Sequence, residues 1–544
     1  MPGWLRNTVI LMWILLALCV LAEPLTTWPR ADEADYFLGA RLIAQGMVPY
    51  RDFFDFITPA GQYGTALLFK LFGYSVIMIR LLVVLSWLAG SRIIFQMAKR
   101  FMPLEWCWLA TLFVIIGLPN FLVHQHHYWS GWIVLLGTYC VFLYLENPRK
   151  ILLLLASLCF GLAPWITQSS GGLALTGLLI FSIMETLKRH GGIQSWFKTW
   201  GAVFGGVLGV SIVFCIFLIM QGAWAHFYED TLGWLSGGHY AETTLLGYYP
   251  KLWEEIGNIL LPLNSQLSVM TKIFYGMRLT DIPYLFLIGC LPLLGFLGWA
   301  IFLWHPNAEL LRNKTEGIQT SQLRLIGLIG LMMILATFSY GTSLHFISNG
   351  SLAFLFGFIV LHQLLTTPLQ RMLCGSGFIL LYVSLFMAAL IHSTIFFMLG
   401  TWLPSWGGSH ERLTVFAAPQ DVKDYLATIE VLNQASQKNQ RVLVLYQSPD
   451  LYLAARGYQN TTRFRRIIPV YTSNRKIKEI MADIDKNKPV YIIDDQTLSS
   501  IQDDSRFQKY SSDKLKLPQF ENLERYCYKL SQINGRYKVY KRVQ

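Results

Sequence analysis

The sequence predicts an all-α membrane domain that crosses the bilayer many times, followed by a small C-terminal α/β domain. Three observations lead to this prediction: the composition, the apolar segments and the charges between them. The chain has 544 residues, of which 54% are hydrophobic and 15% aromatic, and its mean hydropathy is +0.42. Values this apolar are typical of multi-pass membrane proteins. We expect the membrane domain over residues 1–400 and the second domain over 401–544.

About 11 apolar segments are expected to span the membrane, although several are shorter than the ~20 residues that cross a bilayer directly. The first, roughly Val9 to Leu21, lacks a convincing signal-peptide cleavage site and is predicted to stay as an anchor. The others lie near 75–97, 104–122, 127–145, 151–167, 171–186, 200–220, 283–304, 323–339, 350–366 and 375–399.

Basic residues collect in every second turn between these segments, as the positive-inside rule requires. With Arg6 inside, the inside turns hold Lys99-Arg100, Arg149-Lys150, Lys188-Arg189, Arg312 with Lys314, and Arg371. The alternation puts the N-terminus in the cytoplasm and the C-terminal domain outside. The same residues account for the net charge of +12 without a nucleic-acid partner. The expected partner of the apolar surface is the lipid bilayer.

The first outer loop, from Arg30 to Gly73, gathers carboxylates directly after the first span. Carboxylates so close to hydrocarbon are costly unless they face water, a partner or a substrate, so they indicate a functional site. Apolar residues at helical spacing from Tyr36 to Met47 predict a short amphipathic helix on the membrane surface. A second helix is expected to end near Phe72. The loop acids are Asp32, Glu33, Asp35, Asp52 and Asp55.

The order of motifs in this loop resembles a known family of membrane enzymes. The shared features are the acidic pair Asp32-Glu33, then Tyr36, Ala40-Arg41, Gly46, Pro49-Tyr50-Arg51-Asp52 and Pro59. They resemble the polytopic glycosyltransferases of the GT-C fold, in particular the bacterial branch related to aminoarabinose transferases and protein O-mannosyltransferases. Many relatives have Lys-Pro-Pro where this chain has Thr58-Pro59-Ala60, so no lysine contact to a donor phosphate is expected at that point.

The resemblance implies an inverting glycosyltransferase of the bacterial inner membrane, transferring a hexose or pentose. The donor would be a sugar linked to polyprenyl phosphate, and the acceptor an envelope lipid, glycan or protein at the outer face. The catalytic carboxylate carries over to Asp32, with Glu33 beside it. Asp32 could instead cap the helix, since acids stabilise its positive N-terminal end. No cofactor is assigned, and a divalent cation held by Asp32 and Glu33 stays an open alternative.

Further candidates for donor or acceptor binding lie in the loop and at the outer ends of the predicted spans. Asp52 and Asp55 are lower-ranking acids of the loop. Arg80 could hold a donor phosphate or extend its charge to the interface as a snorkelling arginine. The turn containing His126 and His127 fits a wet interfacial aromatic belt, and less well a donor pocket or zinc site.

The remaining candidates lie in later outer turns. Gln168 could bind a sugar or cap two helix ends, and His345 lies in a polar turn that could line a cavity. The longest outer loop, about 221–282, is rich in aromatic residues that suit sugar rings or interfacial helices equally. It offers the acids Glu229-Asp230, and the cations Lys272 and Arg278 as phosphate partners.

The region after residue 400 has the composition and patterns of a small α/β domain. Helices are expected at 421–434 and 474–485, a helical turn at 450–456, strands at 441–446 and 490–493, and a hairpin around Asn534-Gly535. No phosphate-binding or nucleophile motif occurs there, so an accessory role is predicted. Its excess of basic residues suits contact with anionic lipid.

Two other functions remain open from the sequence. A transporter or flippase of lipid-linked saccharides would require internal repeats or paired broken helices, and neither is evident. An O-antigen ligase or polymerase would use diphosphate-linked donors and would lack an acidic pair directly after the first span. The acidic loop therefore favours the polyprenyl-phosphate-dependent glycosyltransferase.

Overall fold

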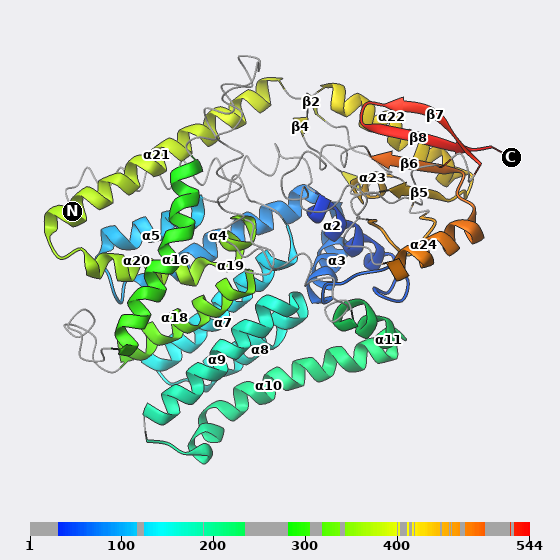
Figure 1. Cartoon of the computed structure of the whole chain (residues 1–544). Helices are drawn as coiled ribbons and strands as arrows, with labels where there is room; N and C mark the ends of the chain where they lie inside the picture. The colour runs from blue at the N-terminus through cyan, green and yellow to red at the C-terminus, as the bar shows by residue number, and fades with distance from the viewer. Residues whose placement is uncertain are drawn as a thin grey trace.

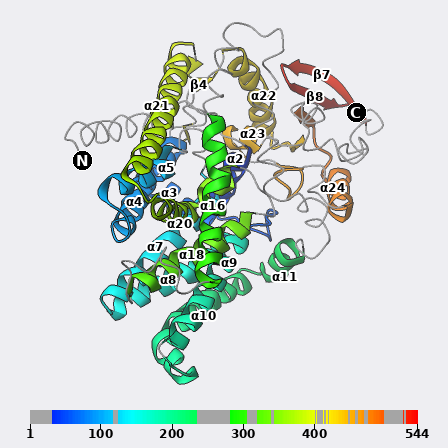
Figure 2. The same cartoon turned by 60° about the vertical axis from the view of Figure 1, so that its left-hand side comes forward.

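The computed structural model describes residues 31–116, 124–188, 190–233, 281–304, 318–337, 343–399, 401–402, 411–412, 416–417, 419–445, 449–455, 457, 460–467, 474–495, 523 and 527–543. They form a bundle of apolar helices and a smaller region, at one side of it, that contains a four-stranded sheet (Figure 1). In Figure 1, helices α2 (Ala31–Ala44) and α3 (Ala60–Phe72) lie between the bundle and the sheet, and the turned view shows α2 beside α23 (Pro449–Ala454) of the sheet region (Figure 2).

The bundle has the helices of a multi-pass membrane protein. In the described part, six are long and apolar enough to cross a membrane: α4 (Val76–Ala98), α7 (His126–Glu146), α9 (Gln168–Lys188), α10 (Ile193–Met220), α18 (Ile318–Thr337) and α21 (Pro368–Leu399). Shorter apolar helices accompany them: α5 (Leu104–Ile116), α8 (Lys150–Ile166), α16 (Asp281–Trp304) and α20 (Ser351–Leu364). Every predicted span after the first coincides with one of these helices. The first lies outside the described residues, and the total of about 11 stays a prediction.

Close helix contacts in the bundle depend on glycine. A Cβ atom on Gly131 of α7 would lie 2.1 Å from the carbonyl oxygen of Ser348 in α19 (Ser343–Asn349). One on Gly357 of α20 would lie 2.3 Å from the carbonyl oxygen of Leu291 in α16. Lipid tails give no hydrophobic force between helices, so membrane helices associate through such close packing. The first of these contacts holds the N-terminal end of α7 against α19, and both elements carry histidines of the candidate site.

Helix α2 departs from its prediction. An amphipathic surface helix was expected, but the side chains between Glu33 and Ile43 are buried, with only Asp35 partly exposed. Helix α23 (Pro449–Ala454) packs on it from the C-terminal region. The Arg41 guanidinium donates to the carbonyl oxygens of Leu453 at 2.7 Å and Ala455 at 3.2 Å. The apolar residues of α2 surround the helix instead of forming one face, and a helix of that kind is buried.

The C-terminal region contains a mixed sheet in the order β5-β6-β8-β7. Strands β5 (Val442–Leu445) and β6 (Tyr491–Asp495) are parallel, whereas β8 (Tyr537–Arg542) is antiparallel to β6 and to β7 (Tyr528–Asn534). Gly535 turns the β7–β8 hairpin with a φ of 54°, in the left-handed region that glycine tolerates. Helices α22 (Pro419–Gln437) and α24 (Asn474–Asn487) complete the region. The predicted helices, strands and hairpin are confirmed.

Two short pairs of strands accompany the sheet. Strand β1 (Tyr74–Ser75), which directly precedes α4, pairs in parallel with β3 (Glu411–Arg412). Strand β2 (Thr401–Trp402) follows α21 and pairs antiparallel with β4 (Phe416–Ala417). The first pair ties the start of a membrane helix to the C-terminal region.

Alternation along β5 divides the C-terminal region into two cores. Val442 and Val444 belong to a core that includes α22, α2 and α3, whereas Leu443 and Leu445 belong to a core with α24. Successive strand residues point to opposite faces, which explains this division. The first core is shared with the outer helices, so the sheet does not pack independently of them. The predicted domain boundary at residue 401 stays a prediction, and the C-terminal region shares this core with α2 and α3.

Candidate functional site

One short segment of the C-terminal region meets the acids of the first outer loop. It is the run Arg463-Phe464-Arg465-Arg466, here called the arginine segment. Each of its arginines contacts a different set of carboxylates from the N-terminal half of the chain. These contacts bring together acids that the sequence placed in two separate outer loops.

Asp32 is the acid of the site that is most open to solvent. It lies in the first turn of α2, its side chain is 56% exposed, and its Oδ1 lies 2.6 Å from Nη1 of Arg466. Desolvation by the surrounding protein raises the pKa of Asp32, but the Arg466 guanidinium outweighs it and the net pKa is lowered. His345 and His126 lie near enough to add to this lowering when they are protonated. Asp32 is therefore a charged carboxylate at neutral pH.

Glu33, the next residue, has the opposite environment. Its two carboxylate oxygens accept from Arg80 of α4, Oε1 from Nε at 2.9 Å and Oε2 from Nη2 at 2.5 Å. Both side chains are 1% exposed. The interpretation of Arg80 as a snorkelling arginine is thus wrong, because its charge is neutralised inside the protein. Asp32 and Glu33 thus face different arginines, Arg466 and Arg80.

Asp55 is held by three donors. Its Oδ1 accepts from the backbone N–H of Ile57 at 3.0 Å, and its Oδ2 accepts from Gln62 at 2.6 Å and from Arg465 at 2.8 Å. Arg465 also contacts Asp35, whose carboxylate lies 3.4 Å from it. Burial raises the pKa of Asp35 more strongly than Arg465 lowers it. These buried contacts favour a structural role for Asp55.

Asp52 fixes a turn at the surface of the loop. Its Oδ2 accepts from the backbone N–H of Val48 at 2.7 Å, and its carboxylate pairs with the neighbouring Arg51 at 2.8 Å. The hydrogen bond from Arg51 lowers the pKa of Asp52. Arg51 also donates to the carbonyl oxygen of Gln221 after α10. Asp52 thus holds Arg51, and Arg51 links the loop to the end of α10.

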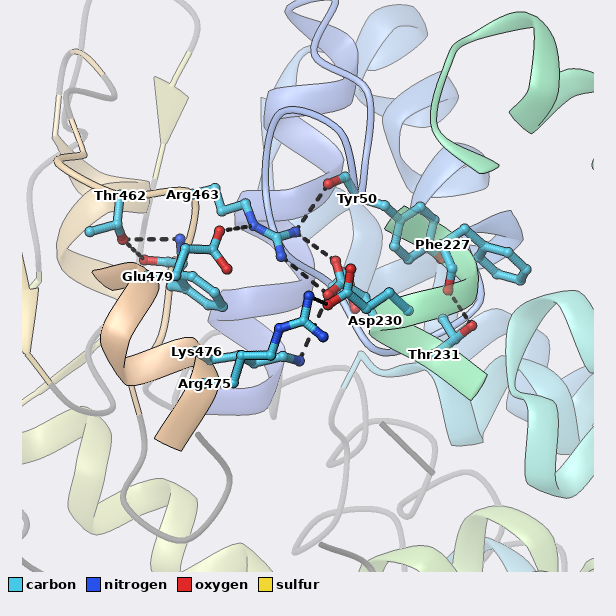
Figure 3. A network of polar contacts seen from close by, with 12 residues as sticks. Tyr50, Phe227, Asp230, Thr231, Thr462, Arg463, Arg475, Lys476 and Glu479 are labelled. Carbon is cyan, nitrogen blue, oxygen red and sulfur yellow. Dashed lines mark hydrogen bonds and ion pairs between the residues drawn. The ribbon is translucent and has the colours of Figure 1, made fainter. Parts of the chain in front are cut away.

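A second network surrounds Asp230 in the π-helical turn η1 (Tyr228–Gly233), shown in Figure 3. Asp230 is fully buried, and its carboxylate accepts from both terminal nitrogens of Arg463, at 2.6 and 3.2 Å. Arg463 also donates to Glu479 of α24 and to the carbonyl oxygen of Tyr50. Lys476 lies 3.8 Å from Asp230. Burial raises the pKa of Asp230, and Arg463 opposes that rise.

Glu229, the neighbour of Asp230, is partly exposed instead of buried. It forms an exposed pair with Arg475 at 2.7 Å. The predicted phosphate partners Lys272 and Arg278 lie outside the described residues.

The predicted histidines come together where α7, α9 and α19 meet. Nδ1 of His126 lies 3.0 Å from the Thr167 hydroxyl, and the ring centroids of His127 and His345 are 4.3 Å apart. Gln168 donates to the carbonyl oxygen of Phe56 at 2.7 Å and so links α9 to the outer loop. Among the residues that the structure describes, no group of three or more His, Cys, Asp or Glu side chains is arranged to hold a metal ion.

His124 corrects part of the aromatic-belt prediction. Its ring is fully buried, with Nδ1 accepting from Trp129 at 3.0 Å and Nε2 3.0 Å from the Thr65 hydroxyl. The ring of Phe37 stacks on the His124 ring with 4.8 Å between the ring centroids. Burial lowers the pKa of His124 to about 3, so this histidine is neutral. It serves the packing of α2 and α3 and is not a wet interfacial residue.

Sequence reasoning missed the arginine segment. The only signal was compositional: three arginines within four residues of a basic region, and an outer loop with five acids against four basic residues. Oppositely charged groups that leave water are costly unless they pair, so such clusters are expected to meet.

The overall fold has counterparts among solved structures. A crystal structure of ArnT from Cupriavidus metallidurans bound to undecaprenyl phosphate matches with a TM-score of 0.50 and 12% identity, over 99% of this chain and 98% of that chain. The apo oligosaccharyltransferase from Archaeoglobus fulgidus matches with a TM-score of 0.53 and 10% identity, over 93% of this chain and 71% of that chain.

The fold is therefore that of the GT-C glycosyltransferases, as the outer-loop motifs predicted. More particularly, it is similar to an aminoarabinose transferase over nearly the whole of both chains. At such low identity the likeness shows the fold alone. No protein-family model matches the sequence, and no curated protein matches it either.

Proposed function

We propose that this protein is an inverting glycosyltransferase that moves a sugar from a polyprenyl-phosphate donor to an envelope acceptor at the outer membrane face. The observation that carries the proposal is the position of Asp32. Asp32 is a charged, solvent-open carboxylate on α2, and the next residue of that helix, Glu33, pairs with Arg80 near the start of the membrane helix α4. The other acids of the loop are engaged in structural contacts.

The reaction needs one base at this place. The acceptor hydroxyl attacks the anomeric carbon from the face opposite the phosphate, and its proton passes to Asp32. A new carbon–oxygen bond forms while the bond from the anomeric carbon to the phosphate oxygen breaks. Its electron pair leaves with the polyprenyl phosphate. Because phosphate is already a good leaving group, no general acid is required, and a single displacement inverts the anomeric centre.

The donor class is supported by chemistry and by the fold. The phosphate of a polyprenyl carrier lies at headgroup depth, where an outer juxtamembrane carboxylate can meet an acceptor arriving from water. The ArnT structure of the same fold contains undecaprenyl phosphate. We extend that donor class to this chain, with an envelope lipid, glycan or protein as the acceptor and with the N-terminus in the cytoplasm.

The test compares envelope glycans by mass spectrometry in cells that contain the wild-type protein, no protein, or Asp32→Asn. We expect one glycan species to disappear without the protein and to stay absent with Asp32→Asn, because loss of a general base lowers rates by roughly 10²–10⁴-fold. Asp485→Asn, the same exchange on the exposed side of α24, is the control and should retain the glycan.

Equal amounts of each variant in the membrane are verified by immunoblot. Wild-type glycan levels with Asp32→Asn would refute the assignment of the base.

A further inference from the structure

The three arginines of the arginine segment differ in the exposure of the carboxylates that they meet. Arg463 and Arg465 pair with Asp230 and Asp55, and both carboxylates are buried. Arg466 is exposed to the same extent as Arg463, at 18% against 17%, but its partner Asp32 is 56% exposed. The first two arginines thus fix the segment, whereas the third meets its carboxylate where a ligand can enter.

Backbone contacts hold the segment firmly against the outer loop. The N–H of Phe54 donates to the carbonyl oxygen of Arg463 at 2.9 Å. Phe464 is buried, its N–H donates to the Thr462 hydroxyl at 3.0 Å, and its carbonyl oxygen accepts from Asn460 at 2.7 Å. Hydrogen bonds therefore hold the backbone on the N-terminal side of Arg466 against the outer loop.

We propose that Arg466 is shared between Asp32 and the phosphate of the lipid donor. The inference rests on the proposed function and adds to it a phosphate-binding residue from the C-terminal region. Before the donor enters, Arg466 neutralises Asp32. When the phosphate enters, the guanidinium moves to the phosphate oxygens and leaves the Asp32 carboxylate able to take the acceptor proton.

Both the Asp32 carboxylate and the donor phosphate are anions that a guanidinium can bind. A guanidinium presents its N–H groups in a planar fork that fits phosphate as well as carboxylate. A carboxylate bound to that fork is a poor base, because the same interaction that holds it favours its unprotonated form. The exchange would make the base available only when the donor is present. It would also supply a cation that the outer loop lacks at Thr58-Pro59-Ala60.

If two anions compete for one guanidinium, a change in one anion alters the affinity for the other. If Asp32 and the phosphate compete, then removal of the carboxylate charge must strengthen phosphate binding. The gain must depend on Arg466, since the two anions are coupled through it. A double-mutant cycle isolates this coupling.

The experiment measures binding of undecaprenyl phosphate to the purified full-length protein in lipid nanodiscs, by intrinsic tryptophan fluorescence. We expect Arg466→Gln to weaken binding roughly tenfold, as for loss of one charge-assisted contact. Asp32→Asn should strengthen binding about threefold to tenfold, and this gain should vanish in the double variant. Arg475→Gln removes an exposed, paired guanidinium from the same region and should bind as wild type does.

Each alternative result is decisive. Affinity that is unchanged by Arg466→Gln, or a gain in Asp32→Asn that persists in the double variant, overturns the exchange. Thermal midpoints equal to that of the wild type show that the variants are folded, and Arg466→Lys should keep part of the affinity. Loss of the envelope glycan with Asp32→Asn, together with binding unaffected by Arg466→Gln, would leave the glycosyltransferase standing without the exchange. Absence of binding by the wild type would overturn both.

Discussion

The ion pair of Glu33 and Arg80 allows the role of Glu33 to be tested directly. In Glu33→Gln the side chain keeps its shape but loses its charge, while the Arg80 guanidinium stays where it is. Both side chains are 1% exposed, and two short hydrogen bonds join them. The substitution therefore removes the charge of the buried carboxylate that pairs with Arg80 and leaves the guanidinium charge inside the protein.

The expected loss is large. Removing one partner of a buried ion pair costs about 3–5 kcal/mol, because the other charge remains desolvated. An exposed pair contributes only about 0–1 kcal/mol, so Glu229→Gln, which breaks the exposed contact with Arg475, is the matched control. Replacing both buried partners, as in Glu33→Leu with Arg80→Met, should recover most of the loss, since no charge is then buried.

The assay is thermal unfolding in detergent, followed by size-exclusion chromatography, with envelope glycan measured for each variant. Glu33→Gln and Arg80→Gln should each lower the midpoint, the double replacement should restore it, and Glu229→Gln should leave it unchanged. A wild-type midpoint for Glu33→Gln combined with loss of the glycan would refute this reasoning. It would place Glu33 beside Asp32 in the chemistry.

Three further predictions concern contacts around the site. Arg463→Gln leaves the buried Asp230 without its two strongest donors, so amide hydrogen exchange across η1 should accelerate at least tenfold; unchanged exchange would show that the contact does not hold the turn. Because Arg466 lowers the pKa of Asp32 before the donor binds, Arg466→Gln should shift the acidic limb of the pH profile of kcat/KM, which reports the free enzyme, to higher pH, and an unmoved limb would contradict the pairing. Gly131→Ala should cost about 1–3 kcal/mol by forcing α7 from α19, measured as a lower thermal midpoint.

The parts of the fold that the sequence predicted are those with a local signal. Each membrane helix after the first appears where an apolar segment was found, because burying a span requires a continuous apolar stretch. The strand Val442–Leu445 and the turn at Gly535 were predicted from their residue types for similar reasons. Helix α2 was misjudged because its apolar residues from Phe37 to Ile43 needed a partner that the local pattern does not reveal.

The candidate site was predicted only in part, because the burial and the ion-pair partners of its side chains depend on residues far away in the sequence. Asp32 and Glu33 are neighbours, yet successive residues of a helix point about 100° apart. One carboxylate therefore meets Arg466 at the surface, and the other meets Arg80 in the interior. The histidines of the outer turns were found because they lie at span ends. The arginine that faces Asp32 lies 434 residues away and has no local signal that pairs it with that acid.

The contact between Arg41 and the carbonyl oxygen of Leu453 can form only late in synthesis of the chain. The two residues are 412 positions apart, and ribosomes add about 5–20 residues per second. Helix α2 must therefore wait for about 20–80 s before the strands and helices that cover it have been made. During that interval its apolar surface can contact only nascent membrane helices and lipid. We expect this helix to be the point where an assembling chain most needs protection by chaperones.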